Sequence, residues 1–281
     1  MEFVEKGISL YQEGKTEEAL DYYEKAISVG SADAQAYFNK GVALKIIGKF
    51  EEAFDCYDKA SHLDPDYVNA YFSAGVTLNE MKKSKKALDC YEKAISLDPN
   101  DAHAYFNKGI TLEKMEKYEE AIDCYDKAIS LDSNDANFYN QKGLALSEIG
   151  KCGEAVDCFD KAISLNSNYA KAYCNKGIAL SELEKNEEAV DCCDKAISLD
   201  PNEADFYVNK GKFLHRIEKY EEAVQCYDKA LSLDSEGPAA YFAYLHKGYA
   251  FEQIGKYEAR KLEEAQECFV KAGTLYPFFV S

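Results

Sequence analysis

Apolar and polar positions along this chain follow a helical spacing that is interrupted at regular points. In residues 34–67, one stripe of apolar and small side chains runs up to a short break near Lys49, and a second stripe follows the break. The first stripe comprises Tyr37, Gly41, Leu44 and Gly48, and the second comprises Phe50, Ala53, Phe54, Tyr57, Ala60 and Leu63. This pattern predicts two helices joined by a short turn.

The pattern recurs every 34 residues along most of the chain. Glycines keep this period at Gly7, Gly41, Gly75, Gly109, Gly143, Gly177 and Gly211, and an eighth follows 37 residues later at Gly248. Alanines keep it as well, at Ala19, Ala53, Ala87, Ala121, Ala155, Ala189 and Ala223. Small residues that recur in phase indicate places where helices approach closely. The sequence therefore predicts an internal repeat whose units share one continuous core.

Charges and a proline define the ends of the second helix in each unit. Acidic pairs such as Glu51 and Glu52 open it, and a lysine such as Lys59 lies near its end, which complements the helix dipole. The sequence "LDP" at 63–65, 97–99 and 199–201 then predicts the end of the helix.

A 34-residue helix pair with aromatic, Gly, Leu, Ala, aromatic, Ala and Pro in this order resembles the tetratricopeptide repeat. The resemblance implies an all-α, right-handed superhelical solenoid of antiparallel helix pairs, in which the first helix of each pair lines a concave groove. Where that family often has Trp, this chain has Tyr and contains no Trp. We expect a single array over residues 1–277, followed by a short apolar tail at 278–281. Its repeats are expected at approximately 1–33, 34–67, 68–101, 102–135, 136–169, 170–203, 204–237 and 238–277.

The eighth unit departs from the period. Gly248 comes three residues late, and Ala265 lies five residues beyond the place that the repeat predicts. A longer turn or an extended second helix would accommodate both. The residues after Ala272 are too few for a further polar helix, so we expect one end of the array to be uncapped.

The charge of the chain excludes some classes of partner. The formal net charge is -18, which opposes binding to the phosphates of nucleic acid or to anionic lipid surfaces. No apolar stretch approaches the ~20 residues of a membrane span, and the start of the chain has no secretory signal pattern. We expect a cytoplasmic protein that binds neither nucleic acid nor membranes.

Most of the ten cysteines follow the repeat. One cysteine occupies the same place in successive second helices, at Cys56, Cys90, Cys124, Cys158, Cys192, Cys226 and Cys268. Equivalent positions of stacked helices are too far apart for disulfides, and no zinc-type spacing with histidine is present. We interpret these seven, the cysteine ladder, as small hydrophobic packing residues with free thiols. The remaining cysteines, Cys152, Cys174 and Cys193, have no convincing partner in the sequence.

No catalytic motif is readable in the chain. It has no HExxH, GxSxG, Walker-type loop or GxGxxG, and its four histidines form no constellation. We therefore expect a protein that is not an enzyme and that needs no cofactor or metal.

The resemblance implies that places two, five, six, nine, twelve and thirteen of each repeat face the groove. Place six carries an amide in most repeats, as in family members where Asn holds the main chain of an extended peptide. The amides stand at Asn39, Asn107, Gln141, Asn175 and Asn209, and Ser73 takes this place in repeat 68–101. Places five and nine are apolar in the first half, at Phe38, Val42, Phe72, Val76, Phe106 and Ile110. These side chains either receive apolar groups of a peptide or pack into the core.

One groove segment is basic in an otherwise acidic chain. Lys212, His215 and Arg216 lie one helical turn apart in the seventh repeat, where they could hold a carboxylate or could simply be solvated. Glu148 and Glu182 make the middle of the groove acidic. A peptide with a basic centre and an acidic end would match this pattern.

The sequence favours a non-enzymatic scaffold that binds an extended peptide or helix of a partner protein. The main alternative is a self-assembling solenoid, a homo-oligomer that associates through its uncapped end and the "PFFV" segment at 277–280. A third interpretation is that the chain is the repeat domain of a larger protein. The sequence does not separate these alternatives.

Overall fold

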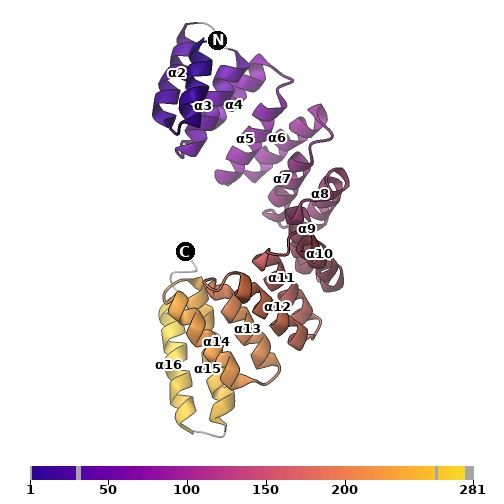
Figure 1. Cartoon of the computed structure of the whole chain (residues 1–281), viewed down its shortest axis with the longest axis vertical. Coiled ribbons are helices and arrows are strands. Elements are labelled where there is room, and N and C mark those ends of the chain that lie inside the picture. Colours follow the sequence, from indigo (N-terminus) through magenta and orange to yellow (C-terminus); the bar gives the residue numbers. More distant parts are fainter. Residues whose placement is uncertain (1, 30–32, 257–258, 276–281) are drawn as a thin grey trace. The chain divides into compact units, whose positions relative to one another are not determined.

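The computed structural model describes residues 2–29, 33–256 and 259–275, and this part of the chain is helical with no strand (Figure 1). The all-α prediction is therefore confirmed. The "PFFV" segment lies outside the described residues. None of the helices in the described ranges is long and apolar enough to cross a membrane.

The chain divides into two compact units, residues 1–134 and 135–281. The first unit contains α1 (Glu2–Gln12), α2 (Thr16–Ser28), α3 (Ala34–Ile46), α4 (Phe50–Leu63), α5 (Val68–Glu80), α6 (Ser84–Leu97), α7 (Ala102–Glu113) and α8 (Tyr118–Leu131). The second unit contains α9 (Ala136–Glu148), α10 (Cys152–Leu165), α11 (Ala170–Glu182), α12 (Asn186–Leu199), α13 (Ala204–Arg216), α14 (Tyr220–Leu233), α15 (Pro238–Gly255) and α16 (Ala259–Leu275). The predicted helix ends at Leu63, Leu97 and Leu199 are confirmed. The single continuous array over 1–277 stays a prediction.

In seven of the helix pairs, the turn between the two helices has one residue in the left-handed region. Gly48 follows α3 with a φ of 80°, and its backbone N–H donates to the carbonyl of Lys45. The N–H of Lys49 then reaches back to the carbonyl of Leu44, so two carbonyls at the end of the helix are satisfied. In other repeats, residues with side chains adopt this φ, at Lys82, Glu116, Glu184 and Glu218.

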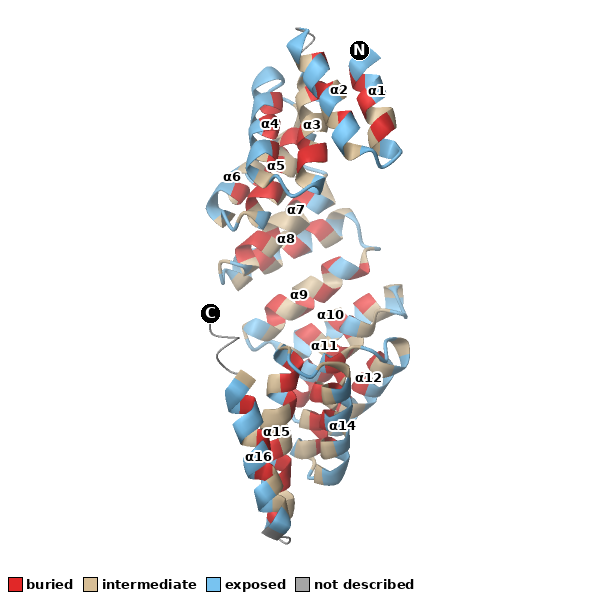
Figure 2. Ribbon diagram, turned by 90° about the vertical axis from the view of Figure 1, so that its left-hand side faces the viewer, coloured by how far each residue is buried: buried red, intermediate tan, exposed pale blue. Residues whose placement is uncertain are grey.

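Buried residues lie along the facing sides of the paired helices (Figure 2). In most repeats the glycine at place eight of the first helix lies under an aromatic ring of the second helix. A Cβ on Gly41 would lie 2.7 Å from Tyr57, and one on Gly211 would lie 2.4 Å from Tyr227. The small residues that recur in the sequence therefore mark close helix contacts, as predicted.

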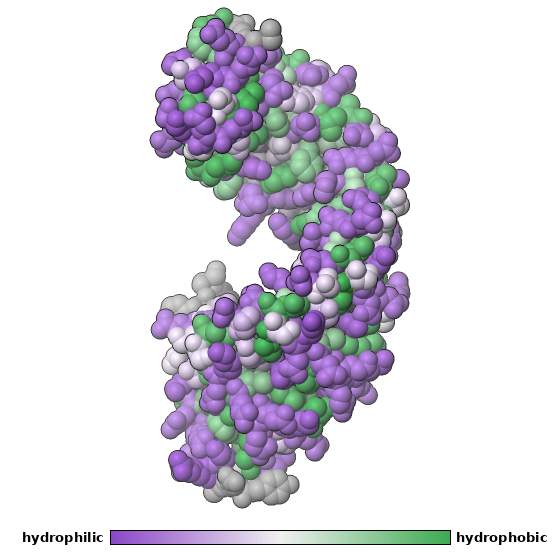
Figure 3. All heavy atoms as spheres, in the orientation of Figure 1, coloured by the Kyte–Doolittle hydropathy of each residue, from purple (hydrophilic) through white to green (hydrophobic). Residues whose placement is uncertain are grey.

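Ion pairs join consecutive repeats on the surface. Lys40 of α3 contacts Glu24 of α2 at 2.9 Å, and Lys176 of α11 contacts Asp160 of α10 at 2.6 Å. Each lysine comes 16 residues after its acid, so the pair connects the second helix of one repeat to the first helix of the next. Hydrophilic side chains cover most of the visible surface of each unit, and apolar residues form small separate patches (Figure 3).

The last repeat absorbs its extra residues by lengthening both helices. Helix α15 has 18 residues and α16 has 17, whereas α13 and α14 have 13 and 14. Pro238 opens α15, where a missing N–H costs no hydrogen bond. The extension therefore involves the first helix as well as the second.

Candidate functional site

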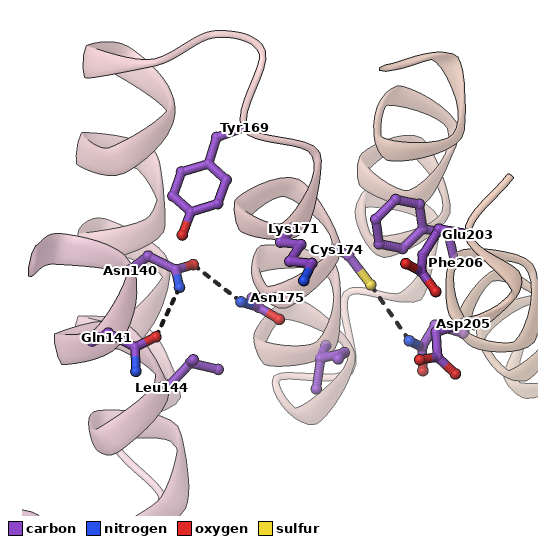
Figure 4. Close-up of a pocket in the computed structure, with 12 residues that line it drawn as sticks. Asn140, Gln141, Leu144, Tyr169, Lys171, Cys174, Asn175, Glu203, Asp205 and Phe206 are labelled. Carbon is purple, nitrogen blue, oxygen red and sulfur yellow. Dashed lines mark hydrogen bonds between the residues drawn. The ribbon is translucent and has the colours of Figure 1, made fainter. Parts of the chain in front are cut away.

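Amide side chains converge around one pocket of the second unit. The pocket has a volume of about 550 Å³ and lies against the first helices of three successive repeats, α9, α11 and α13 (Figure 4). Its amides are Asn140, Gln141, Asn175 and Asn209. Three of them were predicted from the repeat, and Asn140 was missed because it occupies place five, where three repeats of the first unit carry Phe.

Hydrogen bonds between repeats hold these amides in place. The Nδ2 group of Asn175 donates to Oδ1 of Asn140 at 3.0 Å, and Nδ2 of Asn140 donates to Oε1 of Gln141 at 3.3 Å. Asn209 makes the equivalent contact one repeat later, where its Nδ2 donates to Sγ of Cys174 at 3.4 Å. An amide has two N–H donors and an oxygen acceptor, so each of these bonds leaves further capacity for a ligand.

Charged and aromatic side chains border the amides. Glu203 and Asp205 lie at the start of α13, and Lys171 lies at the start of α11. The hydroxyl of Tyr169 donates to Oδ1 of Asn137 at 3.0 Å, and burial raises the pKa of this tyrosine. The pocket can therefore accept a polar main chain and a basic side chain.

The corresponding amides of the first unit are bonded differently. Nδ2 of Asn107 donates at 2.9 Å to the carbonyl of His103 in its own helix. Asn39 accepts from Gln35 at 3.0 Å, and its own Nδ2 is buried without a partner among the described residues. No amide bond between repeats of the kind made by Asn175 is recorded for either residue in the described part of this unit.

The three predicted phenylalanines pack on buried tyrosines of their own repeats. Ring centroids lie 5.7 Å apart for Phe38 and Tyr57, 6.0 Å for Phe72 and Tyr91, and 5.7 Å for Phe106 and Tyr125. Val42 and Val76 pack against the same clusters, and Ile110 is half-buried. These side chains contribute to the core. Their role toward a partner stays a prediction.

The basic cluster of the seventh repeat adjoins a second pocket of about 330 Å³, which His246 of α15 also lines. Arg216 is already bonded to the preceding repeat, since it donates to the carbonyl and hydroxyl of Ser181 and contacts Glu182 at 3.1 Å. Burial lowers the pKa of His215, and burial together with the charges of Lys212 and His215 lowers the pKa of His246 to about 4. At neutral pH the cationic charge of this pocket therefore comes chiefly from Lys212 and Arg216.

A lysine-rich segment at the start of α6 was missed in the sequence. Lys82, Lys83, Lys85 and Lys86 surround Ser84, and Lys114 lies near them. In five other repeats the lysine before the second helix pairs with an acid three residues later, as Lys49 does with Glu52. Here the residue three places after Lys83 is another lysine. The sequence does indicate this segment, because it lacks the acidic pair that begins most second helices.

The cysteine ladder behaves as buried packing. Burial raises the pKa of the thiols of Cys56, Cys124 and Cys268, and raises that of Cys90, Cys192 and Cys226 to about 11. Among the residues that the structure describes, no three His, Cys, Asp or Glu side chains converge as metal ligands.

Comparisons with known proteins agree with this architecture. Two family models described as tetratricopeptide repeat match residues 34–67, 68–101, 102–135 and 170–203, and residues 124–157 and 192–225. A third, described as TPR repeat, matches residues 7–48 and 143–184. Together these matches run without a gap from residue 7 to residue 225. No curated protein sequence matches the chain.

Three solved structures are similar over different lengths. The crystal structure of YrrB, a TPR protein with an unusual peptide-binding site, is 30% identical, with 64% of this chain and 92% of that chain covered at a TM-score of 0.55. A tetratricopeptide repeat protein from Parabacteroides merdae shares 19% identity, with 86% and 97% covered at a TM-score of 0.68. A chain of the APC/C hetero-tetramer Cut9-Hcn1 shares 17% identity at a TM-score of 0.66; the match covers 87% of this chain but only 48% of that one.

Proposed function

Because this chain belongs to the tetratricopeptide-repeat family, whose members bind protein or peptide partners, we propose that it is a non-enzymatic scaffold that holds an extended peptide against α9, α11 and α13. The observation that carries the proposal is the amide pocket of the second unit. Amides from three consecutive first helices face one pocket there, and each retains hydrogen-bonding capacity.

An extended peptide suits this arrangement physically. Its main chain offers an N–H donor and a carbonyl acceptor in every residue, and an amide side chain satisfies either. The existing bonds between Asn140 and Asn175, and between Asn209 and Cys174, restrict the rotamers of these amides before a ligand arrives. This preorganisation reduces the ordering cost of binding.

The charges around the pocket favour a basic side chain in the peptide. Glu203 and Asp205 line it from one helix start, and Lys171 is its single basic lining residue. A lysine or arginine beside the two acids would be attracted, and long-range attraction from the net charge of -18 would assist its association. YrrB, 30% identical over 64% of this chain, has a peptide-binding site by description, which supports the same use of the fold here.

The test is a peptide selection on the purified protein. Displayed random peptides are selected on the wild type, and the affinity of the enriched peptides is then measured by fluorescence anisotropy for wild type and variants. We expect at least a tenfold loss of affinity in the Asn175→Ala, Asn209→Ala double variant, and enrichment of Lys or Arg in the peptides. Asn107→Ala serves as the matched control, because that amide is bonded within its own helix. Equal affinity for wild type and double variant would exclude the amide pocket as the site.

A second function, self-association through the last helix, is favoured by a separate observation. Leu262 and Val270 of α16 are 49% and 59% exposed. Exposed apolar side chains on a helix of a solenoid are suited to contact another copy. Light scattering should then show an oligomer for the wild type and a monomer for the Leu262→Glu, Val270→Glu variant. A monomeric wild type at high concentration would remove this alternative.

A further inference from the structure

Two cysteines of the sixth repeat occupy places that hold an aromatic pair elsewhere. In three repeats of the first unit, place five in the first helix and place twenty-four in the second helix carry aromatic rings in contact, as in Phe38 with Tyr57 and Phe106 with Tyr125. In the sixth repeat the same two places carry Cys174 of α11 and Cys193 of α12. The fold therefore directs these two side chains toward each other, and both are buried, at 4% and 0% exposure.

The side chains of the two cysteines interact electrostatically. The sulfur of Cys174 accepts a hydrogen bond from Nδ2 of Asn209 at 3.4 Å. Cys174 lines the amide pocket, and Figure 4 shows its sulfur turned toward the pocket lining. The sulfur of Cys174 thus faces the pocket, whereas Cys193 is fully buried in α12.

The two cysteines differ in their access to the pocket, because Cys174 lines it and Cys193 is fully buried. The interaction with Cys193 and the hydrogen bond from Asn209 lower the pKa of Cys174 in spite of its burial, whereas the interaction with Cys174 and burial raise the pKa of Cys193. By contrast, burial raises the pKa of six of the seven ladder cysteines. Thiol reactivity toward oxidants follows thiolate character and access, and oxidation-sensing cysteines often lie beside a second, resolving cysteine.

We propose that Cys174 and Cys193 form a reversible disulfide when the protein meets a peroxide, with Cys174 as the attacking thiol and Cys193 as the resolving thiol. The pair is thus a redox modification site within the wall of the amide pocket.

The chemistry balances with hydrogen peroxide as the oxidant. The Cys174 thiolate attacks one peroxide oxygen, the O–O bond breaks, and the sulfenic acid forms while the departing hydroxide takes up a proton as water. The sulfur of Cys193 then attacks the Cys174 sulfur, the S–S bond forms, and the sulfenic oxygen leaves as a second water. Two thiols lose two electrons and two protons, and a dithiol reductant such as dithiothreitol reverses the change.

Oxidation would also change the pocket. The disulfide draws the Cys174 sulfur toward α12 and away from Asn209, whose Nδ2 loses its acceptor. Asn209 is one of the amides that we propose to hold the peptide, so this consequence, unlike disulfide formation itself, rests on the proposed function.

Mass spectrometry of the native protein tests the proposal. The wild type is exposed to hydrogen peroxide, free thiols are blocked with N-ethylmaleimide, and the protein is digested with trypsin without reduction. We expect a linked pair of peptides, residues 172–176 and 186–195, that disappears after dithiothreitol. The second peptide contains Cys192 as well as Cys193, so variants must separate the two.

The variants give opposite results under the proposal. Cys192→Ala should keep the linked pair, whereas Cys193→Ser should lose it and accumulate a sulfenic acid at Cys174 that dimedone labels. A Cys192–Cys193 disulfide in the wild type, loss of the linked pair in Cys192→Ala, or no linked pair in the wild type would each overturn the proposal. Circular dichroism shows whether Cys193→Ser is folded; if it is not, Cys192→Ala and Cys174→Ser decide. The measurement detects linked tryptic fragments of this chain and needs no bound partner peptide. The disulfide proposal therefore holds or fails independently of the proposed peptide binding.

Discussion

Gly109 of α7 lies so close to Tyr125 of α8 that a Cβ added to the glycine would come within 2.5 Å of Cε1 of the ring. Tyr125 is fully buried, so its ring has no free space to move into. The same contact recurs at Gly41, Gly75 and Gly211, and it sets the distance between the two helices of a repeat. At Gly177 the contact is absent, because place twenty-four of that repeat is Cys193 rather than an aromatic residue.

Alanine substitutions should distinguish these two kinds of glycine. Gly109→Ala forces the helix and the ring apart. Overpacking of this kind lowers the free energy of unfolding by about 1–3 kcal/mol, and the higher helix propensity of alanine offsets about 1 kcal/mol of this loss. At Gly177 the nearest side-chain atoms to an added Cβ are 3.4 Å away, and the nearest backbone atom is 3.1 Å away. Urea unfolding should show Gly177→Ala to be more stable than Gly109→Ala by at least about 1 kcal/mol. Equal stabilities would mean that the ring contact does not limit the helix distance.

The turns between paired helices allow a second comparison. Glu184 has a φ of 63° and Gly150 has a φ of 76° at the equivalent place of the preceding repeat. A residue with a Cβ is strained in this region by about 1 kcal/mol relative to glycine. Glu184→Gly should therefore raise the free energy of unfolding by up to about 1 kcal/mol, and Gly150→Ala should lower it by a similar amount. Changes of the same sign in both variants would contradict this explanation.

The lysine segment at α6 should be a site of electrostatic repulsion. Lys86→Glu restores the pair that Lys49 and Glu52 make in another repeat, and it places an acid in the first turn of the helix. We expect a stabilisation of about 0.5 kcal/mol at low salt, which should fall in 1 M NaCl. Lys85→Glu is the control, since it gains the dipole interaction without the spacing to Lys83. A gain that persists at high salt would rule out an electrostatic cause.

Acid should destabilise the C-terminal repeats through His246. Its pKa of about 4 in the folded protein lies below the value of about 6.5 expected when unfolded. Above pH 6.5 both states are neutral at this site. As the pH falls toward 4, the unfolded state binds the proton first and the folded state loses up to about 2 kcal/mol, with solvent screening taken into account. His246→Gln removes this protonation of the unfolded state. Between pH 6.5 and 4, the free energy of unfolding of the variant should therefore fall less than that of the wild type.

Features that recur in successive repeats were predictable from the sequence, because the same residue types appear at the same place several times along the chain. The helix ends at "LDP" and the close approach at Gly41 and its equivalents are local consequences of residue type, and the structure contains both. The predicted amides of the second unit also line one pocket.

Features that occur once were not predictable in the same way. The interaction between Cys174 and Cys193 could be expected only by knowing that places five and twenty-four face each other, and this follows from the packed helices. Arg216 extends to Ser181 in the preceding repeat, and the spacing along the chain does not reveal the reach of such a long side chain. His246 was missed because the three extra residues of the last repeat conceal its equivalence to the place-six amides.

The cysteine at place twenty-four also has a consequence for how the chain folds. The volume that a tyrosine ring fills in other repeats is filled around Cys193 by Phe213, which belongs to the next repeat. Leu180 and Cys193 of one repeat thus share their interior with α13 of its neighbour. The sixth repeat cannot complete its own interior, so it and the seventh should open and close together as one cooperative folding unit.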